Sequence, residues 1–158
     1  MADTLSVEDR SRNMASIRSS NTKPEMYFRS LLCSAGYRYH LQNRQIPGSP
    51  DIFILKYHVA VFVHGCFWHR HDRCKYAYMP KSNVEFWEHK FSQNVARDRA
   101  VAEQLRGSGV RQLVIWECAY RKMLKDAPFA ARVTALINGF VRGDETYCEI
   151  SPDSVSQA

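Results

Sequence analysis

A run of eleven residues at 64–74, HGCFWHRHDRC, gathers metal-binding and titratable side chains in the middle of the chain. Its two cysteines and one of its histidines follow the spacing C-x4-H-x2-C, and a further cysteine comes soon after the apolar run at 110–116. Three thiolates and one imidazole form the closed tetrahedral set that is typical of structural zinc, whereas a catalytic zinc keeps one position open for water. The candidate zinc ligands are Cys66, His71, Cys74 and Cys118.

Two alternatives to this ligand set stay open at the level of sequence. His64 or His69 could bind the metal in place of His71, although the choice of His71 leaves the other two imidazoles free for chemistry. The cysteines could also be scattered reduced thiols, but the clustering of Cys with His in a reducing compartment favours a metal site over disulfides. Cys33 and Cys148 are expected to take no part in the site.

A carboxylate stands where a buried strand is expected to begin. Asp51 follows Pro50 and precedes an apolar run, and a carboxylate at such a place can bind a hard cation such as Mg²⁺. Alone, Asp51 would be better explained as a polar turn residue. With His64 and His69 nearby, a cation-binding carboxylate and imidazoles that titrate near neutral pH would suit phosphodiester hydrolysis.

The predicted hairpin is what brings these residues together. The segments 51–55 and 58–63 are near-continuous apolar runs, which predicts two strands covered on both faces. Only the dipeptide KY separates them, so a tight hairpin is expected. Its register sets Asp51 opposite Phe62, beside the start of the 64–74 run.

Two Phe-Trp pairs accompany the candidate ligands. Phe67 and Trp68 lie between metal ligands, where inward packing is difficult, and Phe86 and Trp87 open a predicted helix. Apolar side chains inserted between base steps can unstack and kink a duplex. The alternative is that both pairs pack against each other as a small satellite core.

The rest of the pattern predicts the elements that position these groups. A capping box at Thr22–Glu25 begins a helix that Gly36 ends, and it explains Glu25 without any chemistry. A second box at Ser82–Glu85 begins a long helix that ends at Gly107. Further strands are expected at 37–41 and 110–116, and a last amphipathic helix at 126–141. This order predicts a mixed α/β fold with helices on both faces of one sheet.

Charge and length limit the function classes. The 158 residues suit one domain, and the formal net charge is +6. All 22 basic residues lie before position 143, where they outnumber 12 acidic ones, so the body favours a polyanionic partner such as nucleic acid over an inert basic surface. No apolar run approaches the roughly 20 residues of a membrane helix. The polar N-terminus predicts a cytoplasmic protein without a secretory signal.

These motifs together resemble the very-short-patch repair endonucleases of bacteria. The resemblance covers roughly residues 8–142 and rests on SRNM, PGSPD, HGCFWH, EFW, ARDR and VIWEC, in that order along the chain. It implies a fold similar to that of type II restriction endonucleases. It also implies nicking of double-stranded DNA on the 5′ side of the mismatched T in T:G pairs, which arise from deamination of 5-methylcytosine.

The resemblance further implies a role for each matching position. Asp51 and the backbone carbonyl of Val63 would bind Mg²⁺, His69 would activate the attacking water, and His64 would stand at the scissile phosphate. Glu25 would be an acidic residue near the metal site. The aromatic wedge would consist of Phe67, Trp68 and Trp87 from the major groove, with Met14 entering the minor groove. The zinc set is the one given above.

The resulting hypothesis is a monomeric, Mg²⁺-dependent mismatch endonuclease with a structural zinc. Its expected parts are an N-terminal helical DNA-binding arm at 1–20, a restriction-endonuclease-like catalytic domain at 21–142 and an acidic C-terminal tail at 143–158. Expected partners are T:G-mismatched DNA and, beyond it, mismatch-repair proteins and a cytosine methyltransferase pathway, with no membrane. The rival hypotheses are a zinc-dependent DNA-binding module without catalysis and a restriction-type nuclease without mismatch preference.

Overall fold

The computed structural model describes residues 6, 8–9 and 20–157 of the chain. Their core is one sheet with the strand order β1-β2-β3-β4-β5, in which the first three strands run antiparallel and the last three parallel. The strands are β1 (His40–Leu41), β2 (Ile52–Ile54), β3 (Val59–His64), β4 (Arg111–Trp116) and β5 (Tyr147–Ile150). The predicted mixed α/β sheet is thus confirmed, although the strand expected at 37–41 is only two residues long.

The register of the β2–β3 hairpin is the predicted one. Ile52 pairs with Val61 and Ile54 with Val59, and the same register sets Asp51 opposite Phe62. The turn is longer than the expected dipeptide, because Leu55–Tyr57 form a 3-10 turn, η1, and His58 takes a left-handed conformation with φ of 52°. Nearly every side chain of β3 is buried, so the strand is covered on both faces, as its continuous apolar run predicts.

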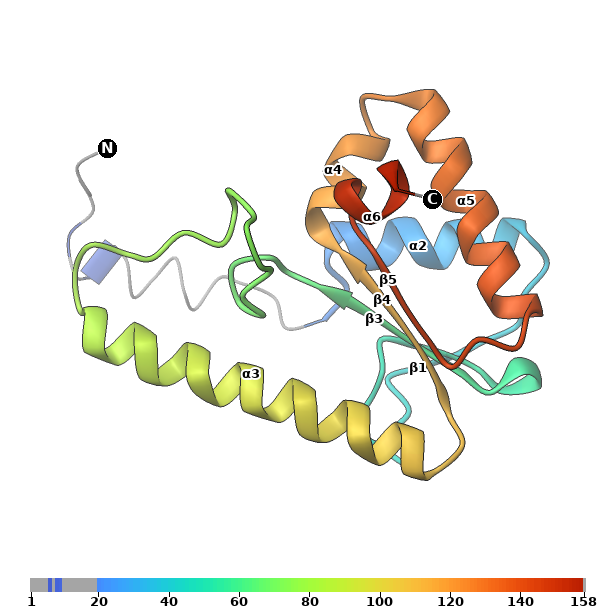
Figure 1. Ribbon diagram of the computed structural model, residues 1–158, viewed down its shortest axis with the longest axis horizontal. Coiled ribbons are helices and arrows are strands. Elements are labelled where there is room, and N and C mark those ends of the chain that lie inside the picture. The colour runs from blue at the N-terminus through green and yellow to red at the C-terminus, as the bar shows by residue number, and fades with distance from the viewer. Residues whose placement is uncertain (1–5, 7, 10–19, 158) are drawn as a thin grey trace.

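Helices cover both faces of this sheet (Figure 1). The helices are α2 (Lys23–Ser34), α3 (Val84–Gly107), α4 (Glu117–Met123), α5 (Ala127–Arg142) and α6 (Pro152–Ser156). In Figure 1, α2 and α5 lie on one side of the sheet and α3 on the other, where its N-terminal half extends alongside the connection from β3. In the described part of the chain, no helix has the length and apolar character needed to cross a membrane.

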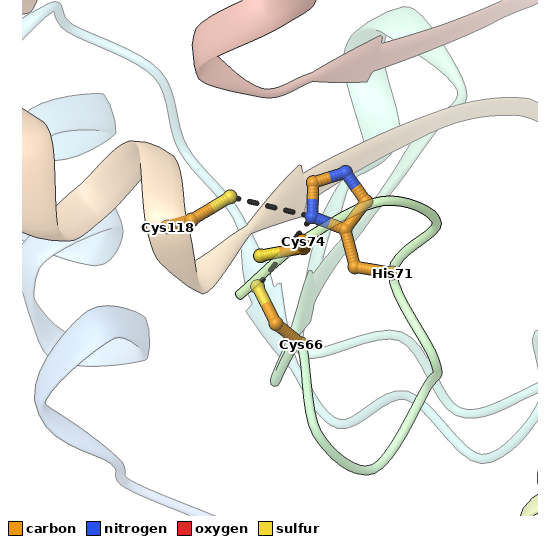
Figure 2. Close-up of side chains that lie close together, drawn as sticks. All are labelled: Cys66, His71, Cys74 and Cys118. Atoms are coloured by element: carbon orange, nitrogen blue, oxygen red, sulfur yellow. Dashed lines mark hydrogen bonds between the residues drawn. The ribbon is translucent and has the colours of Figure 1, made fainter. Parts of the chain in front are cut away.

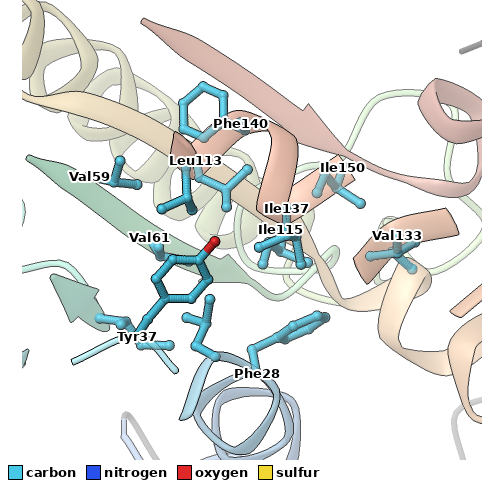
Figure 3. Packing of buried hydrophobic residues seen from close by; sticks show 14 of the residues in the cluster. Phe28, Tyr37, Val59, Val61, Leu113, Ile115, Val133, Ile137, Phe140 and Ile150 are labelled. Carbon is cyan, nitrogen blue, oxygen red and sulfur yellow. The ribbon is translucent and has the colours of Figure 1, made fainter. Parts of the chain in front are cut away.

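The two faces carry apolar clusters of different size. The larger cluster joins α2, α4, α5 and α6 to the odd-numbered side chains of β3 and β4, including Val61, Leu113 and Ile115 (Figure 3). The smaller one joins Phe62 on the opposite face to Leu105 of α3. The sheet is therefore firmly supported on one face, whereas the α3 face has room for polar side chains near the end of β3.

The first residues of the helices agree with the predicted ones for α2 and α5 but not for α3. Asp126 caps α5 by accepting from the Phe129 N–H at 2.9 Å. Thr22 caps α2, as expected from the first capping box. The start of α3 is one residue later than predicted, because its N-cap is Asn83 and not Ser82. Asn83 has a left-handed φ of 54°, which Asn tolerates better than most residues, and its side chain makes no capping hydrogen bond.

The chain beyond Arg142 adds β5 and α6, which the sequence pattern did not predict. Ile150 and Val155 are buried in the larger cluster. Tyr147 and Glu149 alternate with these apolar positions and are exposed. Two buried apolar residues in so short a segment give little periodicity to detect. The same holds for α4, which has only seven residues.

Candidate active site and metal centre

The ends of β3 and β4 place both candidate sites at one end of the sheet. His64 closes β3 and pairs in register with Trp116, which closes β4. Cys118 follows in the first turn of α4. The loop at 65–83 leaves β3, carries the other metal ligands and returns into α3. Parallel neighbours that end together thus bring the cysteines close to the histidines.

The four predicted zinc ligands converge in the structure (Figure 2). Their candidate ligand atoms lie within 4.8 Å of one another. The Nδ1 atom of His71 is 3.6 Å from Sγ of Cys66 and 3.4 Å from Sγ of Cys118. Tetrahedral zinc with ordinary Zn–S and Zn–N bonds would hold S and N about 3.5 Å apart. The donor set and its spacing therefore fit a zinc ion, and His71, not His64 or His69, completes the set.

The thiols of this cluster influence one another strongly. The hydrogen bond with Cys118 lowers the pKa of Cys66 to about 6, and the same hydrogen bond raises the pKa of Cys118. Burial raises the pKa of Cys74. With three sulfurs close together, the first thiol loses its proton easily, and its negative charge then opposes deprotonation of the other two. A divalent cation removes this repulsion between thiolates.

Asp51 lies just before β2 and points at the backbone of β3. Its Oδ2 atom accepts a hydrogen bond of 2.8 Å from the Val63 N–H. The pKa of Asp51 is raised to about 6, chiefly by burial and then by the negative charge of Glu25, while the Val63 hydrogen bond and the charges of His69 and Arg29 act in the opposite direction. A partly buried carboxylate beside a second one is a chemically sensible place for a cation.

His64 and His69 form a parallel stack. Their ring centroids are 3.8 Å apart and the planes differ by 1°. Burial lowers the pKa of His64 to about 3, so this imidazole is neutral at physiological pH. The Nδ1 atom of His69 lies 2.7 Å from Oδ2 of Asp98. A carboxylate at Nδ1 orients the ring and leaves Nε2 available as the proton acceptor.

Asp98 is the site residue that the sequence reasoning missed. It lies on α3, one turn after Asn94, whose Nδ2 donates to the Trp68 carbonyl at 3.0 Å. A signal for both was present in the spacing of the inward face of α3, which alternates four and three residues. That face runs Trp87, Phe91, Asn94, Asp98, Val101 and Leu105. Two polar residues in the middle of an apolar stripe indicate polar partners on the facing segment.

Glu25 is buried and held by local contacts. Its Oε2 atom accepts from the Asn21 N–H at 3.0 Å and from Arg29 at 3.3 Å. Thr22 accepts from the Glu25 N–H, so only half of the predicted box forms, and the Glu25 side chain reaches Asn21 instead of Thr22. The influence of Glu25 on the pKa of Asp51 places it close to the candidate cation site.

The aromatic pairs pack together in the structure. The Phe67 ring lies 5.4 Å from Trp87 and 5.1 Å from Phe91, and Trp68 lies 5.9 Å from Trp87. Trp87 is buried, whereas Phe67 and Trp68 are partly exposed and Phe86 is exposed. The two pairs therefore form a small satellite core in this structure, as the alternative interpretation of the sequence predicted. Met14, the predicted minor-groove residue, lies outside the described residues.

Taken together, the end of the sheet combines a closed Cys₃His cluster with an open acid–base group. Asp51 can bind a cation, His69 with Asp98 can accept a proton, and His64 lies against His69. This arrangement is chemically suited to hydrolysis of a phosphate ester assisted by a divalent cation.

Comparison with known proteins shows that the chain is similar to several DNA endonucleases. Residues 2–75 match the family described as DNA mismatch endonuclease Vsr. The type II nicking enzyme V.XorIIP of Xanthomonas oryzae pv. oryzae is 44% identical over 118 residues, which are 75% of this chain and 86% of that protein. The DNA mismatch endonuclease Vsr of Escherichia coli (strain K12) is 38% identical over 141 residues, 88% of this chain and 90% of that protein. The type II nicking enzyme V.NmeAIP of Neisseria meningitidis is 40% identical over 118 residues, 75% of this chain and 84% of that protein. With these relatives and this site, the chain belongs to the Vsr family of DNA endonucleases.

Proposed function

We propose that this endonuclease nicks double-stranded DNA on the 5′ side of the mismatched T in T:G pairs, with Mg²⁺ as its catalytic cation, and so begins very short patch repair in the cytoplasm. The observation that carries the proposal is the meeting of Asp51, His64 and the His69–Asp98 pair at one end of the sheet. The relatives, which are a mismatch endonuclease and nicking enzymes, support both parts of the proposal.

The cation would be held by the Asp51 carboxylate and the Val63 backbone carbonyl. Oδ2 of Asp51 accepts a hydrogen bond from the Val63 N–H. In an antiparallel pair, the N–H and C=O groups of one residue face the same neighbouring strand. The Val63 carbonyl is therefore on the side of β3 that faces Asp51. Two oxygen donors, with Glu25 nearby, suit a hard cation. When bound, the cation would supply charge neutralisation at the phosphate.

His69 would take the proton from the attacking water. Its Nδ1 atom is engaged by Asp98, so Nε2 is the acceptor, and Asp98 stabilises the imidazolium that forms. His64, neutral and stacked on His69, keeps that ring in one plane and stands at the phosphate. Because residues 20–157 hold one such set, the expected product is a nick made by a monomer, not a double-strand break.

Recognition of the mismatch would come from the wedge of Phe67, Trp68 and Trp87. A T:G step is easier to unstack than a matched one, so insertion of rings is selective for it. Because these rings rest against one another in the free protein, insertion requires the cluster to open. The N-terminal arm at 1–20, with Met14, would enter the minor groove. The zinc cluster would keep the loop that carries Phe67 and Trp68 in place.

A nicking assay on strand-labelled duplexes tests the proposal. Duplexes that differ only in one T:G, T:A or C:G pair are incubated with the protein and Mg²⁺. We expect one cut, 5′ of the T in the T:G duplex only. Equal cutting of all three would favour a restriction-type nuclease without mismatch preference, and binding without any cut would favour a DNA-binding module without catalysis.

A further inference from the structure

Trp116 touches both the metal cluster and the catalytic histidines. Its ring stacks on His71 with centroids 4.3 Å apart and planes 10° apart. It also meets His64 edge to face at 5.4 Å, with an interplanar angle of 71°. Trp116 is buried, with 8% of its surface exposed, so it has little freedom to leave either neighbour. One indole thus separates a predicted zinc ligand from a predicted active-site imidazole.

The indole N–H of Trp116 has a partner on the C-terminal strand. Nε1 donates to Oε1 of Glu149 at 3.2 Å. Glu149 pairs in register with Val114, so it is on the same sheet face as Trp116 and His64. A buried indole N–H usually has an acceptor, and this hydrogen bond selects one orientation of the ring. Glu149 is itself exposed, so the acceptor can be changed without opening the core.

A second contact constrains Glu149. The Tyr147 side chain, two residues earlier on the same strand face, is about half exposed, with 48% of its surface accessible. Partial burial of its phenol raises the pKa of Tyr147, and the negative charge of Glu149 raises it further. The phenol therefore stays protonated at neutral pH and can share the Glu149 carboxylate with the indole. Strand β5 thereby adds a carboxylate beside Trp116 that neither the metal cluster nor the hydrolytic group uses.

We propose that Trp116 and Glu149 are positioning residues, which hold His64 against His69 and tie both to the metal cluster. The inference rests on the proposed roles of His64 and His69. His71 supports one face of the indole, the hydrogen bond to Glu149 fixes its rotation, and its edge limits the movement of His64. Because His64 stacks on His69, fixing the position of His64 also fixes the ring of His69, the proposed proton acceptor. The metal cluster therefore sets the geometry of the active site as well as the fold of its loop.

The test removes the acceptor and then restores it. In Glu149→Ala the Trp116 indole N–H loses its acceptor, whereas Glu149→Gln keeps an acceptor oxygen at the same place. The matched control is Glu145→Gln, which changes an exposed acidic residue of the same segment. We expect Glu149→Ala to lower kcat by about 10-fold, the low end of what losing an outer contact of a functional group costs. KM, zinc content and melting temperature should be unchanged, and the other two variants should behave as the parent protein.

A readout that does not depend on nicking accompanies the kinetics. NMR signals of the Trp116 indole N–H and the His64 ring, assigned from Trp116→Phe and His64→Gln, should move in Glu149→Ala and return in Glu149→Gln. Trp116→Phe keeps the stack but has no N–H, so adding Glu149→Ala to it should have no further effect.

Several results would overturn the proposal: unmoved His64 signals in Glu149→Ala, equal losses in Glu149→Ala and Glu149→Gln, additive effects in the double variant, or a loss that comes through zinc content. If the parent protein cut no duplex at all, the proposed function would fail. The NMR signals would still decide whether Glu149 positions His64.

Discussion

The proposed active site has two halves, and different interactions hold each half in place. Asp51 and His64 stand at the ends of paired strands, above a large apolar core. His69, with Phe67 and Trp68, stands on the loop at 65–83, which contains no helix or strand. The strand half is fixed by pairing and burial. The loop half is fixed by the Cys₃His cluster and by two hydrogen bonds from α3.

This difference explains why a small nuclease would need a structural metal. A loop rich in His, Arg and Lys buries too little apolar surface to offset the entropy of ordering it. Metal ligation can supply that energy, and α3 then selects the orientation of the ring that does chemistry. A substitution in one half should therefore disturb that half and leave the other half intact.

Loss of the metal should have the largest effect on the loop half. In Cys74→Ser we expect zinc content to drop from one ion per chain to none, because one of the four ligands is gone. Zinc binding releases roughly 10 kcal/mol or more in small zinc peptides, enough to decide whether the loop is ordered. Nicking should fall by at least about 10²-fold, the low end of a general base contribution. Elemental analysis and limited proteolysis measure both effects.

The control for this variant is Cys33→Ser, which changes an exposed cysteine outside the cluster. Proteolysis of Cys74→Ser should cut first within 65–83 and leave the strand half protected. Protection of the loop in a zinc-free protein would contradict the assignment of its order to the metal.

Removal of the α3 carboxylate should have a smaller effect on the same half. In Asp98→Ala the His69 ring keeps its stack on His64 but loses the partner at Nδ1. We expect kcat to fall by about 10-fold to 100-fold, less than the full 10²–10⁴ that a general base contributes. Glu103→Ala, which removes an exposed acidic residue of α3, should leave kcat unchanged. A fall in zinc content rather than in kcat would show that Asp98 serves the loop fold.

The smallest predicted effect concerns the stability of the strand half. The pKa of Asp51 is about 6 in the metal-free folded protein against 3.8 as its ordinary value, so the unfolded chain releases this proton more easily. Stability is therefore lost as pH rises from about 4 to 6 and stays lower above that. Asp51→Asn removes the penalty and should be more stable at pH 7 by about 1–3 kcal/mol, a gain that disappears below pH 4.

Urea unfolding of both proteins without divalent cations, across pH 4–8, measures this gain. An Asn variant that is less stable than the parent at pH 7 would mean that the Val63 hydrogen bond outweighs the burial of the charge.

The strand half could be predicted from sequence, whereas the loop half could be predicted only as a set of residue types. Continuous apolar runs separated by two residues favour one register, although a shift by one residue was possible, and the favoured register placed Asp51 correctly. The spacing of cysteines and histidine identified a ligand set that the structure brings together. The path of the loop, by contrast, depends on left-handed residues such as Arg70 and Arg73, which have no sequence pattern.

The missed residues share a physical reason. Asp98 and Asn94 act through contacts to a distant segment, so periodicity shows only that two polar residues interrupt an apolar face. Glu149 lies on a strand of four residues, too short for a reliable alternation. The resting place of Phe67 and Trp68 likewise depends on the rings that α3 offers them, which the loop sequence does not contain.

The most direct test of the central claim, that the end of this sheet is a cation-dependent hydrolytic site, is the nicking rate of Asp51→Asn on a T:G duplex with Mg²⁺, measured beside its affinity for the same duplex. We predict that nicking falls by about 10³-fold or more, because charge neutralisation by the cation contributes several kcal/mol, while DNA binding is retained. A variant that binds and nicks at the parent rate would contradict the account.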